Sequence, residues 1–488
     1  MKNFKTKLNT LRLRHGVRMI ISILMVCLVG MSSGSAQLNK LKKKIPTKPK
    51  TQQSSASTPA PSTSESATAS SSQKEDTIEA NQPSGVVLYV SKSGNNGNPG
   101  TDPTAPLKAL DKALAKAGPG DRINVAEGVY TGTFGVGYWE ITKPVHIYGG
   151  YTQDFSSRSP FENLTVLQPP KDAFDKSANK HVMDMKKALN GVVVDGLVFE
   201  GGLKTPYNGN PDPKRSGKCE GCETGMMMVG PGQKNPEGVM LVLFGNNHIV
   251  RNCIFVNASF GGVRAKLGQA GSGDIEISNN VFVGNRMFGI EGFGLKGQTK
   301  PDGDIVIHHN TILFSWSRLK DLLDFGYGIN VQNDATFRIY ENIIGLNISA
   351  GISSQRFNQD LYIDNNLFFG NKKKDLWFNP GSNVNVQIDA DEFGDLEIPS
   401  AQGNVNQNLK LPLNDPYFQG FLTAQYSETT DYDPNSQANL IREAFGLNKQ
   451  GTINSSVSMY ANRYPWMETL QLIGVHEQKG VQMVNDEL

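Results

Sequence analysis

The sequence predicts an all-β fold, a right-handed parallel β-helix (a solenoid) with a short N-terminal capping helix. Three observations lead to this fold. A strand motif containing Asn recurs through the middle of the chain, and a Gly-Val or Gly-Ile motif recurs in phase with it. In addition, 51 glycines favour frequent turns over long helices. The 488 residues would suffice for several ordinary domains, but repeat architectures do not follow that count.

The Asn motif consists of a strand, a polar pair that ends in Asn, and two apolar residues. Its copies are IVRNCIF (249–255), IEISNNVF (275–282), IVIHHNTI (305–312), FRIYENII (337–344) and LYIDNNLF (361–368). We align Asn252, Asn280, Asn310, Asn342 and Asn366, with Gly196 of the variant VVVDGLVF (192–199) at the same position. The 24 to 32 residues between copies suit one turn of a three-stranded solenoid. Stacked amides can hydrogen-bond along the axis, and Asn tolerates tight turns.

The second motif is Gly followed by Val or Ile, and it opens another short strand in each repeat. Its copies are Gly262-Val263, Gly289-Ile290, Gly328-Ile329 and Gly351-Ile352. Two motifs in phase favour stacked rungs over a β-sandwich, which does not require such a register.

The N-terminal globular part shows strand and helix signals before the repeats begin. Strands are expected at 86–90, 122–125 and 145–148. Helical spacing of Leu107, Leu110, Ala113, Leu114 and Ala117 predicts a short amphipathic helix that ends at Gly118-Pro119-Gly120.

The first 36 residues have the pattern of an export signal. Six basic residues precede the apolar stretch 19–31, and small residues at 34–36 precede the expected cleavage point. The alternative is an uncleaved N-terminal anchor. Residues 37–84 are rich in Ser, Thr, Pro and Lys and lack a core-forming pattern, so we expect a disordered linker there. The chain is therefore expected to be secreted or on the cell surface, with the periplasm also open.

Two long stretches resemble a known family. They are YVSKSGNNGNPGTDPTAPLKALDKALAKAGPGDRINVAEGVYTG (89–132) and HIYGGYTQDFSSRSPFENLTVL (146–167). Together with the repeats to about Asn371, they resemble secreted right-handed parallel β-helix proteins of the pectin-lyase-like group. That group includes polysaccharide lyases, hydrolases and epimerases, so the resemblance implies the fold and leaves the activity open. We assign residues 85–380 to the β-helix and residues 381–488 to its C-terminal end and cap.

The aligned strands predict a candidate binding face. Because side chains alternate along a strand, Val263, Ile290, Ile329 and Ile352 are expected to point inwards and their successors outwards. The outward columns are Arg264, Glu291, Asn330 and Ser353, and then Lys266, Phe293, Gln332 and Gln355. Aromatic rings stack on sugars, and Arg or Lys pairs with uronate carboxylates. The alternative is an ordinary solvated polar face.

The chemistry on this face stays open at the sequence level. For a lyase, Lys266 or Arg264 is the candidate base. For a glycoside hydrolase, Glu291 needs a second carboxylate, and Asp321 or Asp324 are the candidates. Phe293, Asn330, Gln332, Ser353 and Gln355 are then the expected substrate-binding residues.

Other chemistry-bearing residues have mostly structural interpretations. Cys219 and Cys222 are expected to form a local disulfide after export, since a second pair of zinc ligands is missing. His308 and His309 are expected to point to opposite sides of one strand and to be structural. No metal site or cofactor is predicted, although Asp302-Gly303-Asp304 and Asp431 with Asp433 leave calcium open.

Two hypotheses about function follow. The first is a protein that binds, and as an enzyme would cleave, an extracellular polysaccharide with uronate units. The second is a non-catalytic surface protein or adhesin. The 48 basic and 46 acidic residues give no sign of a nucleic-acid partner, and no membrane span is expected after cleavage of the signal.

Overall fold

The computed structural model describes the chain in sixteen stretches. They are residues 85–132, 139–168, 182–200, 239–256, 258, 261–268, 272–285, 287–294, 302–315, 326–332, 334–347, 349–354, 360–371, 374–378, 386–407 and 479–482. The expected signal segment and linker, residues 1–84, lie outside these stretches.

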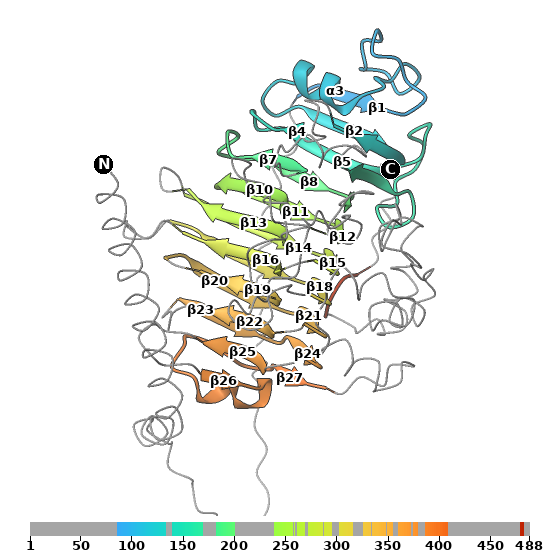
Figure 1. Ribbon diagram of the computed structural model, residues 1–488. Coiled ribbons are helices and arrows are strands. Elements are labelled where there is room, and N and C mark those ends of the chain that lie inside the picture. Colours follow the sequence, from blue (N-terminus) through green and yellow to red (C-terminus); the bar gives the residue numbers. More distant parts are fainter. Residues whose placement is uncertain are drawn as a thin grey trace, which may run out of the picture. The chain divides into compact units, whose positions relative to one another are not determined.

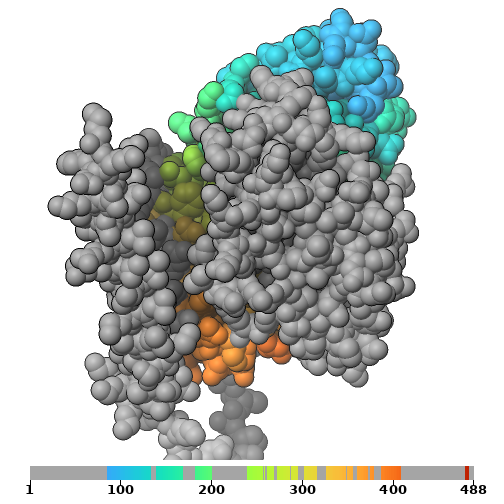
Figure 2. All heavy atoms as spheres, viewed as in Figure 1, coloured from blue at the N-terminus to red at the C-terminus, as the bar shows by residue number. Residues whose placement is uncertain are grey.

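The described strands form three sheets of nine strands each, and from β2 to β25 the chain passes in turn from the first sheet to the second and then the third. Figure 1 shows the rungs stacked from β1 at one end to β26 and β27 at the other. The same order appears in Figure 2, where the blue N-terminal and orange C-terminal rungs lie at opposite ends. This arrangement confirms the predicted parallel β-helix.

The first sheet contains β1 (Val87–Val90), β2 (Arg122–Ala126), β5 (His146–Tyr151), β8 (Val193–Asp195), β11 (His248–Arg251), β14 (Ile275–Ser278), β17 (Asp304–His308), β20 (Thr336–Tyr340) and β23 (Leu361–Asp364). The second contains β3 (Gly128–Thr131), β6 (Thr165–Gln168), β9 (Leu197–Glu200), β12 (Ile254–Val256), β15 (Val281–Val283), β18 (Thr311–Leu313), β21 (Ile343–Gly345), β24 (Leu367–Phe369) and β27 (Val405–Asn406). The third contains β4 (Trp139–Glu140), β7 (Met183–Met185), β10 (Val239–Gly245), β13 (Gly261–Leu267), β16 (Phe288–Phe293), β19 (Tyr327–Val331), β22 (Ala350–Ser354), β25 (Lys374–Phe378) and β26 (Val386–Ile388).

The N-terminal end of the stack carries the predicted helix and strands. Helix α3 (Leu110–Lys116) buries Leu110 and Ala113 against the first rung, and Ala117 follows it. Leu107 lies before the helix and bridges to Val90 of β1. The three N-terminal strands expected from the sequence correspond to β1, β2 and β5, so these predictions are confirmed.

A ladder of buried amides runs along the bend between the first and second sheets. Nδ2 of each Asn donates to Oδ1 of the next, from Asn280 to Asn310 (3.0 Å), Asn342 (3.0 Å), Asn366 (2.9 Å) and Asn404 (3.0 Å). The residue before each rung's Asn turns the chain with a positive φ, as at Asn279 (55°) and Asn365 (56°). Axial stacking of Asn side chains is therefore confirmed from Asn280 onwards.

The prediction for the first copies of the motif is wrong by one residue. Ile254 pairs with Val281, so Cys253, and not Asn252, takes the place of Asn280. The Cys253 amide donates to Asn280 Oδ1 (2.9 Å), whereas Asn252 occupies the turn position with φ 54°. Gly196 (φ 73°) is likewise a turn residue, because the strand after it pairs with β12 in the same register.

A second set of Asn side chains, which the sequence analysis missed, lies at the bend between the second and third sheets. Asn347 Nδ2 donates to Asn371 Oδ1 (2.9 Å), and the Ser315 amide donates to Asn347 Oδ1 (3.0 Å). Asn285 accepts from the Ala258 amide (3.1 Å) in the same way. Both bends are thus held by side-chain amides that satisfy buried backbone groups.

The glycine column of the third sheet has a steric cause. A Cβ at Gly262 would lie 2.5 Å from the Gly289 carbonyl oxygen, and one at Gly328 would lie 2.7 Å from that of Gly351. Such contacts are shorter than a side chain tolerates, so only Gly fits where successive rungs approach here. The residues after these glycines, Val263 among them, are fully buried in the core as predicted.

A buried ion cluster ties the N-terminal rungs together on the outward side of the first sheet. Asp195 has no exposed surface. Its Oδ1 forms a salt bridge with Arg158, and its Oδ2 lies 2.7 Å from Arg251 Nε. Burial by itself would raise the pKa of Asp195, but the two guanidinium groups hold it below its ordinary value.

The C-terminal part closes the described stack in two ways. Strand β26 pairs antiparallel with β25, and the 3-10 helix η2 (Ala390–Asp395) buries Phe393 against the last rung. Residues 479–482 run along the side of the stack, where Gly480 N donates to Glu341 O (2.8 Å) and Val481 N to Thr311 Oγ1 (3.0 Å). Gln482 O accepts from Asn279 Nδ2 (2.9 Å), so these four residues cross three rungs.

Candidate functional site

The outward side of the third sheet brings the predicted residues together. Arg264 pairs in register with Glu291, Glu291 with Asn330, and Asn330 with Ser353. Lys266 pairs with Phe293, and the Gln332 amide donates to Gly292 O (2.9 Å), which places Gln332 beside Phe293. Adjacent strands lie about 4.8 Å apart, so these side chains are immediate neighbours along the axis.

Glu291 is the centre of the first column. Its Oε2 accepts a hydrogen bond from Arg264 Nε, and its Oε1 accepts from Asn330 Nδ2 (3.0 Å) and Gln332 Nε2 (2.9 Å). Glu291 is buried, and the Arg264 guanidinium also lies 5.7 Å from the centroid of the Phe288 ring. Both carboxylate oxygens are thus engaged by side chains of the protein itself.

Asn330 carries an unsatisfied group at this centre. Its Oδ1 is buried and has no hydrogen-bond partner, although its Nδ2 donates to Glu291. A buried polar atom without a partner costs about 1–3 kcal/mol. Such an atom beside an ion pair is a place where a ligand hydroxyl would contribute a missing hydrogen bond.

The second column alternates cations and aromatic rings, and we call it the cation–aromatic strip. Its members, in order along the axis, are Lys186, Phe244, Lys266, Phe293 and Gln332. Lys266 Nζ lies 4.9 Å from the Phe244 centroid and 5.7 Å from that of Phe293. Lys186 Nζ lies 5.9 Å from the Phe244 centroid and 3.2 Å from Asp184 Oδ2. Its side chains are half-buried. Five rungs at about 4.8 Å give the strip a length of about 19 Å.

Comparison with known proteins agrees with this architecture. The family model described as "Right handed beta helix region" matches residues 233–392, which include most of the face just described. The chain is a right-handed parallel β-helix protein. A search of the curated proteins finds no match.

Solved structures similar to this β-helix protein are distant. They include a pectate lyase, Pel9A, at 15% identity (58% of this chain, 69% of that one, TM-score 0.33). A lacto-N-biosidase from Eubacterium ramulus is 13% identical (66% and 55%, TM-score 0.31), so the chain spans about half of that enzyme. A pectin methylesterase from Aspergillus niger is 14% identical (66% and 86%, TM-score 0.30). At these values the likenesses carry no argument about substrate or reaction.

Two residues of the cation–aromatic strip escaped the sequence analysis. In the rung of Phe244, Leu241 pairs with Val263 and follows Met240 instead of a Gly, so only the register of β7 and β10 places Lys186 and Phe244. Ser353 lies in the expected column and is buried, as are Glu291 and Asn330. Gln355, the disulfide candidates Cys219 and Cys222, and the carboxylates Asp321 and Asp324 lie outside the described residues.

The geometry bears on the two reactions considered for this β-helix protein. A glycosidase needs two carboxyl groups about 5–9.5 Å apart. Within the described part of the Arg264 column, the carboxylate nearest to Glu291 along the axis is Asp184, three rungs away at about 14 Å. Of the two lyase candidates, Arg264 is engaged by Glu291, and Lys266 lies between two rings that attract it as a cation. Both side chains are held as cations, and a cation can bind an anionic ligand but cannot accept a proton as a base.

The histidine pair differs from its predicted arrangement. His309 has φ 53°, which ends the strand alternation, and both rings lie on the outer side with Nδ1 atoms 2.8 Å apart. The prediction of opposite sides is therefore wrong. His308 Nε2 lies 3.5 Å from Glu276 and His309 Nε2 3.2 Å from Glu341. Burial, with the neighbouring His308, lowers the pKa of His309 to about 4.

Metal and thiol chemistry find little support in the described stretches. No group of three or more His, Cys, Asp or Glu residues among them is arranged to hold a metal ion. Cys253 is a free, fully buried cysteine, and burial raises the pKa of its thiol well above the usual value. Where the chain is described, no helix has the length and apolarity needed to cross a membrane.

Proposed function

We propose that this β-helix protein is exported and binds an acidic, uronate-containing polysaccharide along the cation–aromatic strip. The observation that carries the proposal is the alternation of Lys186, Phe244, Lys266 and Phe293 on successive rungs. Sugar rings stack on aromatic faces, and lysine ammonium groups pair with the carboxylates of a polyuronate. The regular rung spacing suits a repeating ligand that lies along the axis.

The adjoining Arg264 column supports binding in a second way. The ion pair of Arg264 and Glu291, with the amides of Asn330 and Gln332, forms a fixed polar cluster beside the strip. The unsatisfied Asn330 Oδ1 is an acceptor for a sugar hydroxyl. We assign this cluster to orientation of the glycan, and cleavage remains a separate question that activity assays on bound glycans would answer.

The decisive experiment is binding of the purified chain to a panel of polysaccharides with and without calcium. The charge-reversal variant Lys266→Glu should lose about tenfold or more in affinity for polyuronates, because one favourable charge becomes repulsive. The matched control is Lys112→Glu, an exposed lysine on α3 away from the strip. Equal binding by the two variants, with both folded, would contradict the proposal.

A second variant tests the polar cluster separately. Glu291→Gln keeps the shape of the side chain and removes the charge that Arg264 contacts. Since that change loosens the cluster and leaves the strip in place, polyuronate binding should weaken less than in Lys266→Glu. A panel on which the unaltered chain binds no glycan at all would favour the non-catalytic spacer or adhesin hypothesis instead.

Export is tested independently of binding. Sequencing the N-terminus of the mature protein and fractionating cells would distinguish cleavage near residue 36 from retention of residues 1–36 as an anchor.

A further inference from the structure

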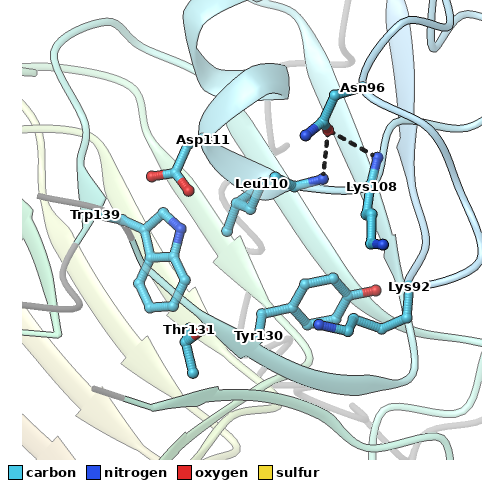
Figure 3. A pocket seen from close by; sticks show the side chains of 9 residues that line it. Lys92, Asn96, Lys108, Leu110, Asp111, Tyr130, Thr131 and Trp139 are labelled. Atoms are coloured by element: carbon cyan, nitrogen blue, oxygen red, sulfur yellow. Dashed lines mark hydrogen bonds between the residues drawn. The ribbon is translucent and has the colours of Figure 1, made fainter. Parts of the chain in front are cut away.

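A pocket of about 260 Å³ lies at the N-terminal end of the stack, away from the third-sheet face discussed so far. It opens between helix α3, the loop after β1, and the ends of strands β3 and β4 (Figure 3). Its lining includes Lys92, Lys108, Leu110, Asp111, Tyr130 and Trp139. The set combines buried aromatic rings with exposed polar side chains.

The floor of the pocket is apolar and rigid. Tyr130 is 3% exposed, and Trp139 and Leu110 are each 1% exposed. The Tyr130 hydroxyl donates to Ala126 O (3.0 Å), which fixes the ring at the floor of the pocket. Lys92 Nζ already lies 5.3 Å from the centroid of that ring. Rings held in this way are suited to stack on the C–H face of a sugar.

Trp139 adds an unsatisfied donor. Its Nε1 is buried and has no hydrogen-bond partner. In Figure 3 the edge of the indole that carries this nitrogen faces the helix side of the pocket, near Leu110 and Asp111. A buried N–H without an acceptor costs about 1–3 kcal/mol, so an acceptor placed at this edge of the indole would be stabilising.

The rim is polar and carries two cations at one side. Lys92, Asn96, Lys108 and Thr131 are exposed. Asn96 Oδ1 accepts from the backbone amides of Lys108 (3.1 Å) and Ala109 (3.0 Å), which holds the loop against the start of the helix. In Figure 3 the two lysines lie on the opposite side of the pocket from Trp139. The pocket therefore carries two cations at one side, and the Asp111 carboxylate and the indole N–H of Trp139 at the other.

We propose that this cap pocket binds a single acidic sugar residue, a hexuronate, as a second site distinct from the cation–aromatic strip. The carboxylate would pair with Lys92 and Lys108, the sugar face would lie on Tyr130, and a ring oxygen or hydroxyl would accept from Trp139 Nε1. The volume is slightly below the about 300–1,000 Å³ typical of sites for larger ligands, which matches one sugar unit and not a chain. The ligand is thus a free uronate or the terminal residue of a polyuronate.

The test uses the full chain labelled at its tryptophan indoles and titrated with glucuronate, galacturonate and glucose. The indole N–H resonance that is missing in Trp139→Phe identifies the pocket. Saturable shifts of that resonance with the uronates, and at least about tenfold weaker response to glucose, are expected because glucose lacks the carboxylate. Titration with a short oligouronate distinguishes the two sources, since a terminal residue shifts the same resonance at lower concentration than the monomer does.

Matched charge variants complete the test. Lys108→Glu should weaken uronate binding about tenfold, whereas Lys112→Glu, four residues further along the chain on α3, should change it less than about twofold. Lys266→Glu should leave the Trp139 response unchanged, so that failure of the strip and failure of the pocket are separable. No uronate response at the Trp139 resonance, or equal effects of Lys108→Glu and Lys112→Glu, would overturn the proposal.

Discussion

The outward faces of the first and third sheets are both polar, yet their charges are used differently. On the first sheet charged side chains pair across rungs, as Arg251 does with Asp195 and Arg338 with Asp304, and Arg338 also lies over the Tyr362 ring. On the third sheet Arg264 pairs with Glu291 and Lys186 lies 3.2 Å from Asp184, but Lys266 lies between two aromatic rings and Asn330 keeps an unsatisfied oxygen. Ion pairs and cation–ring contacts occur on both faces, so the feature that distinguishes the third sheet is a column in which cations and rings alternate on successive rungs.

The comparison is tested most strongly at the buried ion cluster of the first sheet. Asp195→Ala removes the carboxylate that Arg158 and Arg251 contact, so the free energy of unfolding should fall by about 3–5 kcal/mol. Urea denaturation followed by circular dichroism measures it. Because the pKa of Asp195 is lowered on folding, its contribution is present above about pH 4 and is lost as pH falls further. A variant as stable as the unaltered chain would show that this face is not structural.

Adjacent asparagines test the ladder on the same side of the molecule. Asn366→Ala removes hydrogen bonds to Ile339 O (2.9 Å) and Asn404 (3.0 Å), and each buried group left unpaired should cost about 1–3 kcal/mol. The control is Asn365→Gly, because Asn365 is an exposed turn residue with φ 56° that Gly adopts easily, so a change within about 0.5 kcal/mol is expected. Equal losses in both variants would refute the register described above.

On the third sheet the expected effect is on binding and not on folding. Phe293→Ala should weaken polyuronate binding by about 0.5–1.5 kcal/mol, or about two- to twelvefold, because a stacking surface is lost. Isothermal titration calorimetry measures this change. Phe293→Leu, which keeps apolar bulk without the ring, controls for packing against Lys266 and should bind as weakly as the alanine variant. Full affinity in Phe293→Leu would show that the ring itself is unimportant.

The smallest expected effect is a pH dependence at the bend beside the first sheet. Because His309 is neutral in the folded protein, with its pKa lowered to about 4, stability should decrease as pH falls below about 6.5, the unfolded value. His309→Asn tolerates the positive φ and does not titrate, so it should lose about 0.7 kcal/mol less than the unaltered chain between about pH 7 and 6. Parallel denaturation curves at the two pH values provide the measurement.

The repeats predicted the fold because stacking forces one register on all rungs. Val263 and its equivalents are inward, and their successors form the outward column, since strand alternation leaves no other choice. The first copies were misaligned because Asn252 is a turn residue that stands next to Cys253, the true counterpart of Asn280. The alignment matched asparagine with asparagine, whereas the pairing of the following strands matches Cys253 with Asn280.

The candidate sites were only partly visible in the sequence. Lys186 and Phe244 join the strip through strand pairing across the long segment that separates them. The cap pocket draws Lys92, Lys108, Tyr130 and Trp139 from separate stretches of chain, and no spacing rule links them. The turn at His309 reversed a direction that simple alternation predicts. In each case the sequence analysis missed a contact that depends on tertiary packing, which the alternation of side chains along one strand does not reveal.

Residues 479–482 have a consequence for the order of folding. Gln482 and Asn279 exchange two hydrogen bonds across a separation of 203 residues. During synthesis the earlier rungs can assemble as they emerge, whereas this contact must wait until residues 479–482 have been made. Rungs around Asn279, Thr311 and Glu341 would therefore first exist in a looser form, open along one side, and become fully protected from hydrogen exchange only after residues 479–482 have docked.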